Sequence, residues 1–151
     1  MNIRIISFAK RVEPAILQLE KEYLKRITRF ADVEIVNFKP MSEGKINGVE
    51  LKRFEKQFPK NAYWIALTEN GKQISSQEFA AFLQARSQQG VGMICFILGG
   101  AEGLSKPLLD KAHFRLSLSR LTFPHQLARL LTIEALYRSF DLMHGGRYHK
   151  E

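Results

Sequence analysis

The stretch from Cys95 to Ser105 reads CFILGGAEGLS, and it decides the fold because an apolar run leads directly into a glycine loop. Such a run suits a strand that is buried on both faces of a parallel sheet. In α/β proteins, ligands bind beyond the carboxyl ends of such strands. Gly99, Gly100 and Gly103 therefore either approach a ligand or only permit a positive φ in a tight turn.

The two common glycine fingerprints do not match this loop. A phosphate loop requires GxxxxGK[ST], whereas Gly103 is followed by Leu104 and Ser105. The dinucleotide fingerprint opens the first βαβ unit, but here the first apolar segment is followed by AKRVEP, which has no glycine. The same absence argues against the common open-sheet methyltransferases, whose cofactor loop follows the first strand. The glycines alone leave the ligand open.

Strand and helix patterns alternate outward from this stretch. We expect strands at residues 3–8, 33–38, 62–68, 92–98 and 114–118. We expect helices at residues 14–30, in a segment that ends before Pro59, and at residues 75–89, 106–111 and 124–142, and a turn at ENGK, residues 69–72. This order predicts an α/β fold with a mainly parallel sheet and helices on both faces. A chain of 151 residues suggests a single domain over residues 1–151.

The charge balance points to a polyanionic partner. The net charge is +8 and the isoelectric point is about 9.8, which concentrates nucleic acid around a protein, although a solvated basic surface has the same composition. No apolar run approaches the roughly 20 residues of a membrane span, and the N-terminus resembles a strand rather than a signal peptide. The single cysteine, Cys95, suits a reducing cytoplasm and a place in the core.

The four histidines show no spacing typical of metal ligands, so we expect no metal site; they are His113, His125, His144 and His149. Three segments, LTENGK, LGGAEG and LSRLTFP, each follow an expected strand, and their shared edge predicts one ligand site.

The last helix carries two apolar sets at helical spacing, Leu127, Leu130 and Leu131, and then Ile133, Leu136, Tyr137 and Phe140. Either the core or a symmetric contact between two subunits covers this wide face.

The segments LGGAEGLS, LSLSRLTFPHQLARLLTIEALYRSF and YHKE resemble the ribosomal large-subunit methyltransferase H family of the knotted SPOUT class. The resemblance spans nearly the whole chain and is strongest in its final third. It implies a deep C-terminal trefoil knot, which explains why the glycine loop comes late. It further implies a homodimer that uses S-adenosylmethionine to methylate N3 of a pseudouridine in 23S rRNA, in a stem-loop at the ribosomal subunit interface.

The resemblance also implies roles for residues in two regions. The cofactor contacts fall on Leu67, Gly100, Ser119, Arg120, Leu121, Thr122, Phe123 and Pro124. The candidate catalytic residues are His149, Arg138 and Tyr148, and the candidate RNA contacts are Arg138, Arg147, Tyr148 and Lys150. Many relatives have proline where this chain has Arg147, which leaves the pose of the next two residues open. A frayed polar tail is the alternative.

For the mechanism, His149 is the candidate base near neutral pH, and Arg138 is the candidate for electrostatic stabilisation. Two other functions remain open at this stage. One is a different SPOUT enzyme that acts on tRNA or on another rRNA site, against which YHKE argues. The other is a basic RNA-binding module without catalysis, against which the three matching loops argue. The sequence does not distinguish free rRNA, the large subunit and the assembled ribosome as substrates.

Overall fold

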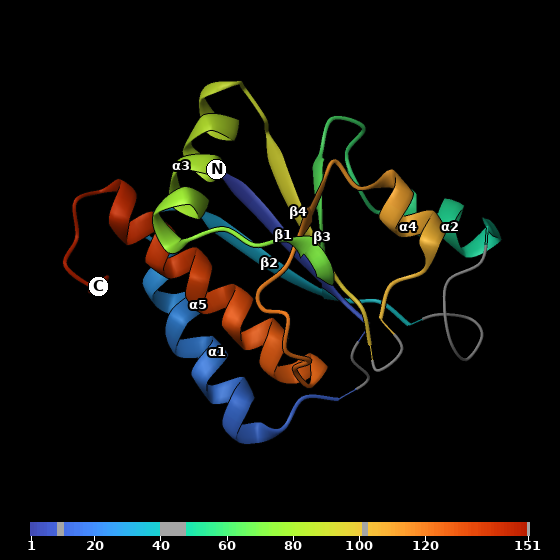
Figure 1. Ribbon diagram of the computed structural model, residues 1–151, viewed down its shortest axis with the longest axis horizontal. Coiled ribbons are helices and arrows are strands. Elements are labelled where there is room, and N and C mark those ends of the chain that lie inside the picture. Colours follow the sequence, from blue (N-terminus) through green and yellow to red (C-terminus); the bar gives the residue numbers. More distant parts are fainter. Residues whose placement is uncertain (9–10, 40–47, 101–102, 151) are drawn as a thin grey trace.

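A computed structural model describes residues 1–8, 11–39, 48–100 and 103–150 of the chain (Figure 1). Its strands are β1 (Asn2–Ser7), β2 (Asp32–Asn37), β3 (Tyr63–Lys72), β4 (Met93–Leu98) and β5 (Phe114–Leu116). Its helices are α1 (Pro14–Ile27), α2 (Gly48–Glu55), α3 (Ser76–Gln88), α4 (Lys106–Lys111) and α5 (His125–Met143). The expected order of strands and helices is confirmed, and most boundaries lie within three residues of the expected ones.

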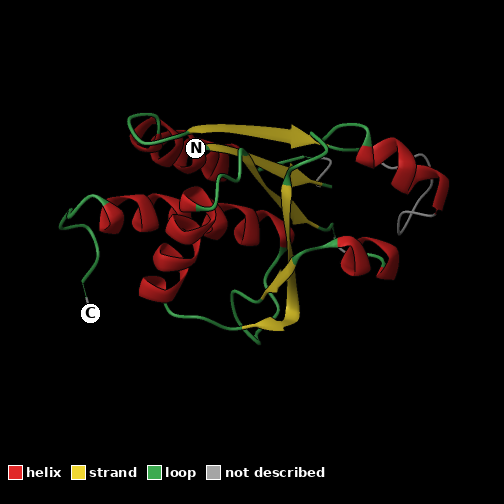
Figure 2. Cartoon of the chain, turned by 90° about the horizontal axis from the view of Figure 1, so that it is seen from above, coloured by secondary structure: helices red, strands yellow, loops and turns green. Residues whose placement is uncertain are grey.

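The five strands form one sheet in the order β2-β1-β4-β3-β5, and every pair is parallel. The helices cover both faces: α1, α3 and α5 lie on one side, and α2 and α4 on the other (Figure 2). This arrangement confirms the α/β fold class. The sheet brings the carboxyl ends of β3, β4 and β5 to one edge, although β4 lies between β1 and β3.

The central strand β4 shows why its sequence is apolar throughout. Ile94 and Phe96 belong to the core under α1, α3 and α5, whereas Cys95 and Ile97 belong to the core under α2 and α4. All four side chains are fully buried. A strand covered on both faces has no polar side, so its residues cannot alternate in character. Burial raises the pKa of the Cys95 thiol to about 12, in agreement with a purely structural role.

The starts of two helices are explained by the residues at their first turns. Ser75 caps α3, because its hydroxyl accepts from the amide of Glu78 at 3.1 Å, and the Glu78 carboxylate accepts from the Ser75 amide at 2.7 Å. This capping box satisfies amides that the first turn leaves unpaired. Pro14 begins α1, where the missing amide hydrogen costs nothing.

The predicted turn at residues 69–72 is wrong. The strand β3 runs on to Lys72, and both Leu67 and Lys72 pair with Leu116 of β5. The intervening residues 68–71 therefore bulge out of the ladder before the chain rejoins it. At Gly71 an added Cβ would lie 2.7 Å from the Leu116 carbonyl carbon, so the bulge needs glycine at the point where the two backbones meet.

A buried ion pair fastens α5 to α1. Arg129 and Glu20 are 3% and 1% exposed. The Arg129 Nε lies 2.7 Å from Glu20 Oε1, and its Nη2 donates to Glu20 Oε2 at 2.8 Å. The remaining Nη1 donates to the side-chain oxygen of Asn37 at the end of β2. The three contacts fix how α5 lies along α1, because two charges this deeply buried must remain paired.

Candidate active site

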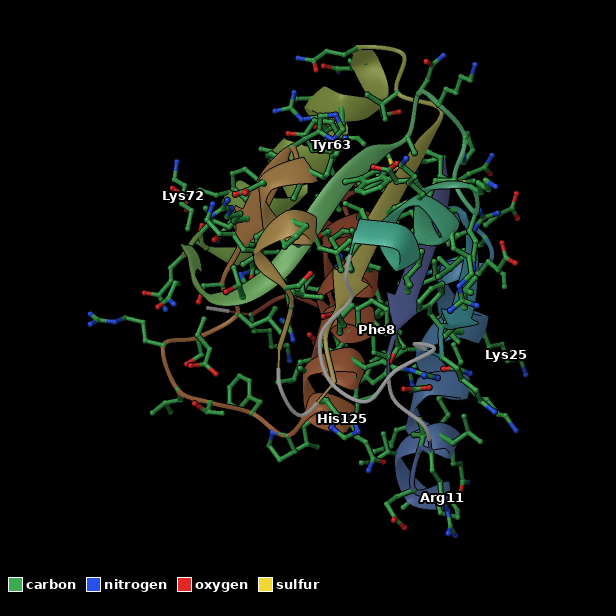
Figure 3. The ribbon with its side chains drawn as sticks, turned by 90° about the vertical axis from the view of Figure 1, so that its right-hand side faces the viewer. Phe8, Arg11, Lys25, Tyr63, Lys72 and His125 are labelled. Carbon is green, nitrogen blue, oxygen red and sulfur yellow. The ribbon has the colours of Figure 1, made fainter. Side chains whose placement is uncertain are left out.

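The bulge in β3 and the loops that follow β4 and β5 line a cavity of about 210 Å³. The start of α5 closes it, and Figure 3 shows His125 there. The sequence predicted that the segments at residues 67–72, 98–103 and 118–124 would meet at this edge, and described residues of all three line the cavity, although the first is a bulge within β3 and not a loop. Of the predicted cofactor contacts, those lining the cavity are Leu67, Gly100, Ser119, Leu121 and Phe123. Arg120, Thr122 and Pro124 lie in the same loop but do not line the cavity.

Gly100 and Gly103 lie close together after β4. The amide of Gly103 donates to the carbonyl of Gly100 at 3.0 Å, and Gly103 has a φ of +73°. An added Cβ on Gly99 would lie 2.5 Å from the carbonyl carbon of Gly103, which no real side chain tolerates. A Cβ on Gly100 would meet only Phe8, at an ordinary 3.6 Å. The loop shape therefore depends on Gly99 and Gly103 more than on Gly100.

The loop after β5 is held by serine side chains. The Ser117 hydroxyl donates to the carbonyl of Ser119 at 2.9 Å. The Ser119 hydroxyl accepts from the amide of Leu121 at 3.0 Å. These bonds direct Leu121 outward, where it is 72% exposed and still lines the cavity. A large apolar side chain held at the rim of a cavity offers a wall to an apolar or aromatic ligand group.

A second group of residues, which includes the predicted catalytic ones, gathers around the second half of α5, and we call it the tail cluster. It comprises Glu134 and Arg138 of α5, Tyr23 of α1, and Tyr148 and His149 of the segment after α5. The Arg138 guanidinium donates to Glu134 and to Nδ1 of His149, the latter at 3.1 Å. The Tyr148 hydroxyl donates to Glu134 Oε1 at 3.0 Å and lies 3.3 Å from the Tyr23 hydroxyl. The guanidinium of Arg138 also lies 4.7 Å from the centre of the Tyr148 ring.

The segment after α5 is anchored rather than frayed. The Asp141 carboxylate accepts from the amide of Tyr148 at 2.9 Å, and the Asp141 carbonyl accepts from the amide of Gly146 at 2.8 Å. An added Cβ on Gly146 would lie 2.1 Å from the Asp141 carboxylate. The Tyr148 ring packs edge-on against Tyr137, with ring centres 4.8 Å apart. The alternative of a loose polar tail is therefore wrong for the segment up to His149.

The contacts in the tail cluster fix the charge of two of its members. The hydrogen bond to Glu134 raises the pKa of Arg138, so the guanidinium is charged under all working conditions. Burial, followed by the bonds to Tyr23 and Glu134, raises the pKa of Tyr148. Tyr148 is therefore a neutral phenol near pH 7 and acts as a hydrogen-bond donor, as it does toward Glu134.

The geometry also restricts His149. Arginine has no lone pair to offer, so Nδ1 of His149 accepts from Arg138. In the neutral ring the proton then lies on Nε2, which is buried and has no partner among the described residues. His149 can accept a proton only on Nδ1, which requires Arg138 to release that atom.

The tail cluster and the cavity lie apart within one chain. None of the members of the tail cluster lines the cavity. Ala128 does line it, and the step along α5 from Ala128 to Glu134 spans about 9 Å. Figure 1 shows the end of the chain beyond the far end of α5. A ligand in the cavity therefore does not meet the predicted catalytic residues of the same chain.

Comparison with known proteins identifies the family. A family model described as "Predicted SPOUT methyltransferase" matches residues 1–149. The chain belongs to the SPOUT methyltransferase family. A protein of Listeria monocytogenes named Ribosomal RNA large subunit methyltransferase H is 39% identical, over 99% of this chain and 100% of its own length. Proteins of the same name from Carboxydothermus hydrogenoformans and Leuconostoc mesenteroides are 35% and 36% identical over the same shares.

Membership of the SPOUT family confirms the resemblance that the late glycine loop and the final third of the sequence indicated. The trefoil knot is implied by the family and stays a prediction here. Within the described residues, no helix is long and apolar enough to cross a membrane. Nor does the described part of this SPOUT chain hold a group of three metal-ligating side chains.

Three residues that line the SPOUT cavity lie outside the three predicted segments and were missed; they are Leu104, His125 and Ala128. Seven others lie within those segments but were not named singly as contacts; they are Thr68, Glu69, Asn70, Leu98, Gly99, Gly103 and Leu118. Thr68, Glu69 and Asn70 reach the cavity because β3 bulges there, and the sequence showed only a turn. His125 was detectable, since the residue after Pro124 at a helix start lies beside the third loop.

The apolar face of α5 divides into two parts. Ile133, Leu136, Tyr137 and Phe140 are buried in the core of this chain. Leu127 and Leu131 are each 40% exposed, and Leu19 of α1 is 44% exposed. The core of this chain therefore covers the set that begins with Ile133. Leu127 and Leu131, together with Leu19, leave apolar surface on the outer side of α1 and α5.

Proposed function

We propose that this protein is an S-adenosylmethionine-dependent methyltransferase that acts on N3 of a pseudouridine in 23S rRNA of the large ribosomal subunit. The observation that carries the proposal is the convergence of the β3 bulge and the loops after β4 and β5 on one cavity in a SPOUT chain. Relatives that match over their whole length are named as large-subunit rRNA methyltransferases, and a net charge of +8 suits an RNA substrate. Such a substrate places the protein in the cytoplasm.

The lining of the cavity suits S-adenosylmethionine. Leu67 and Leu121 supply apolar walls for an adenine ring, and the backbone of the glycine loop allows close approach. Glu69 supplies a carboxylate for hydroxyl or ammonium groups. The cofactor, when bound, supplies a methyl group that its sulfonium has already activated. The protein then has to align that group with the acceptor nitrogen.

The tail cluster suits the other half of the reaction. N3 of pseudouridine carries an imide proton, which leaves as the new nitrogen–carbon bond forms. The charged guanidinium of Arg138 stabilises the negative charge that develops on the base. Tyr148, as a neutral phenol, offers a donor or a stacking face. His149 takes the proton on Nδ1 if the base displaces Arg138 from it.

The separation of cavity and tail cluster favours a homodimer in which each tail cluster serves the partner's cavity. Leu127 and Leu131 on the outer face of α5 offer apolar surface for a symmetric contact. Within one chain the two halves of the site do not meet, so a monomer would hold the methyl donor away from Arg138 and His149. Two copies related by a two-fold axis would complete two sites at once.

Mixing two variants tests this function and its two-chain site, at a limiting concentration of S-adenosylmethionine at which each variant alone is inactive. Gly99→Ala removes the loop shape of the cavity, and His149→Ala removes a member of the tail cluster. Random exchange of subunits should restore about a quarter of the unmutated activity, because half of the dimers then hold one intact composite site. No recovery in a mixture shown to contain heterodimers would contradict the shared site.

The reaction itself is tested on unmutated protein. Calorimetry should detect S-adenosylmethionine binding, and tritium from labelled cofactor should enter 23S rRNA in large subunits or ribosomes but not tRNA. Mapping of the modified nucleoside should give a pseudouridine methylated at N3. Transfer to tRNA instead would identify a different SPOUT activity, and binding of RNA without any transfer would identify a non-catalytic module.

A further inference from the structure

A second cavity, of about 490 Å³, lies on the outer side of α1 beside α5, and we call it the basic groove. It is lined by Glu22, Lys25, Arg26, Arg29 and Tyr137. Three of its five lining residues are cationic and one is anionic. No residue of the basic groove belongs to the first cavity, so the two are separate features of the surface.

The cations of the basic groove are available to a ligand. Lys25, Arg26 and Arg29 are exposed, and neither Lys25 nor Arg26 forms an ion pair with any residue in the described part of the chain. Arg29 lies 3.9 Å from Asp141, but its side chain remains 65% exposed. Figure 3 shows Lys25 directed outward from α1.

Aromatic rings lie against two of the cations of the basic groove. The Arg26 guanidinium lies 5.5 Å from the centre of the Tyr23 ring and 5.7 Å from that of Tyr137. The Arg29 guanidinium lies 4.6 Å from the Phe30 ring. These contacts hold the two guanidiniums in place without neutralising them, because an aromatic face attracts a cation but carries no net charge. Positioned, unneutralised cations bind phosphates at a lower cost in side-chain entropy.

The basic groove continues into the tail cluster. Tyr137 lines the groove, and its ring packs against Tyr148. Tyr23, under Arg26, lies within hydrogen-bond distance of Tyr148. A strand that occupies the groove therefore passes directly beside the predicted catalytic residues. Arg147 and Lys150, which flank Tyr148 and His149 in the sequence, are also exposed.

We infer that the basic groove binds the phosphate backbone of the rRNA strand next to the target nucleotide, and so positions that nucleotide at the tail cluster. The inference rests on the proposed function for the identity of the RNA. Phosphate contacts of this kind fix register and orientation and do not read sequence. Single-stranded RNA suits the groove, since positive channels flanked by aromatic rings track unpaired strands.

The test compares two double variants that each remove two positive charges. Lys25→Gln with Arg26→Gln alters the basic groove, and Lys52→Gln with Lys56→Gln alters the opposite face of the sheet, at α2 and just beyond it. The probe is a stem-loop RNA of the large subunit that contains pseudouridine. Binding is measured by fluorescence anisotropy over a series of salt concentrations.

The groove variant should weaken RNA binding and lower the log–log salt slope by about 1.4, which corresponds to two contacts with single-stranded phosphates. Its KM for RNA should rise, while kcat at saturating RNA and the affinity for S-adenosylmethionine stay unchanged. The α2 variant should keep the slope of the unmutated protein. An unchanged slope in the groove variant, or an equal decrease in both variants, would overturn the inference.

Two further outcomes separate this inference from its neighbours. If sedimentation shows that the groove variant has become a monomer, the groove faces a second copy of the chain and the RNA assignment is overturned. If the salt slope decreases as expected but the unmutated protein methylates no RNA, the assignment of the groove to RNA is supported and the proposed function is contradicted. If methylation proceeds with an unchanged slope, the proposed function stands and the groove assignment falls.

Discussion

The cavity and the tail cluster are built by different means. Backbone shapes the cavity: Gly99 and Gly103 lie close together after β4, and Gly71 closes the bulge in β3. Side chains build the tail cluster, where the Glu134 carboxylate accepts from both Arg138 and Tyr148. Backbone sets the shape that a bound cofactor requires, whereas side chains supply the charge and protons that a reaction requires. Each region should therefore fail under a different kind of substitution.

The helix α5 joins the two regions. Its first turns close the cavity and its second half carries the tail cluster, so whatever positions α5 positions both. The Arg129–Glu20 pair lies between them and holds α5 against α1. Changes to that pair should affect both regions, and changes within either region should affect only one.

The largest expected effect comes from Arg129→Met, which leaves Glu20 buried without a partner. Breaking a buried pair in this way should lower the free energy of unfolding by about 3–5 kcal/mol. For a chain of this size the midpoint of thermal unfolding should fall by roughly 6–20 °C, as measured by calorimetry. The double variant Glu20→Leu with Arg129→Met should regain most of the loss. A single variant as stable as the unmutated protein would show that α5 is held by other contacts.

Gly99→Ala should break the cavity and spare the tail cluster. The added Cβ would lie 2.5 Å from the backbone of Gly103, so the loop must move. We expect affinity for S-adenosylmethionine to fall by roughly tenfold to hundredfold, or about 1.4–2.8 kcal/mol, by calorimetry. Gly92→Ala is the control, because its added Cβ meets no atom within 4 Å and Gly92 does not line the cavity. Equal losses in the two variants would contradict the distinction between these glycines.

Tyr148→Phe should alter the tail cluster and spare the cavity. Loss of the hydroxyl bonds to Glu134 and Tyr23 should cost about 1 kcal/mol in the free energy of unfolding at pH 7. Methylation should fall while affinity for S-adenosylmethionine stays unchanged. A Tyr148→Phe protein that loses cofactor affinity would show that the two regions are coupled within one chain.

The raised pKa of Tyr148 adds a pH dependence to this variant. The folded chain holds the phenol proton more tightly than the unfolded chain, whose tyrosines titrate near pH 10. The contribution of Tyr148 is therefore complete below about pH 10 and decreases as the pH rises above it. Tyr148→Phe should show a smaller loss of stability between about pH 9 and pH 11 than the unmutated protein, by urea unfolding. Tyr63→Phe serves as a control remote from the cluster.

The smallest effect concerns Cys95, which belongs to neither region. Burial raises the pKa of its thiol to about 12, so almost no thiolate exists near pH 8. A chromogenic disulfide reagent should leave the folded protein unmodified, with or without S-adenosylmethionine, and should titrate one thiol in denaturant. Rapid modification of the folded protein would mean that the centre of the sheet opens.

The sequence predicted the parts of the fold that depend on local pattern. The apolar run in β4 and the apolar spacing of α5 both reflect burial of the segment itself. The bulge in β3 was missed because ENGK has the composition of a turn, while its actual path depends on Leu116, which is distant in sequence.

The sequence predicted many residues of the candidate site but not how these residues are positioned. Leu67 and Gly100 were found through the resemblance, and strand order brings their loops together. The anchoring of the tail depends on Asp141 and Glu134, which look like ordinary solvated carboxylates on a helix. Glu20 gave the same impression and is fully buried. No local sequence pattern distinguishes a solvated carboxylate from one that pairs with a residue distant in the sequence.

Because of the buried pair of Glu20 and Arg129, the stability of the contact between α1 and α5 depends on temperature differently from that of a purely apolar contact. Hydration of charged groups becomes less favourable as temperature rises, so the cost of keeping these two side chains away from water falls on warming. The apolar part of the same junction gains little further strength over that range. An apolar replacement of both residues should therefore have its most favourable free energy of unfolding, relative to the natural pair, at low temperature. This difference should shift in favour of the natural pair as the temperature approaches that of unfolding.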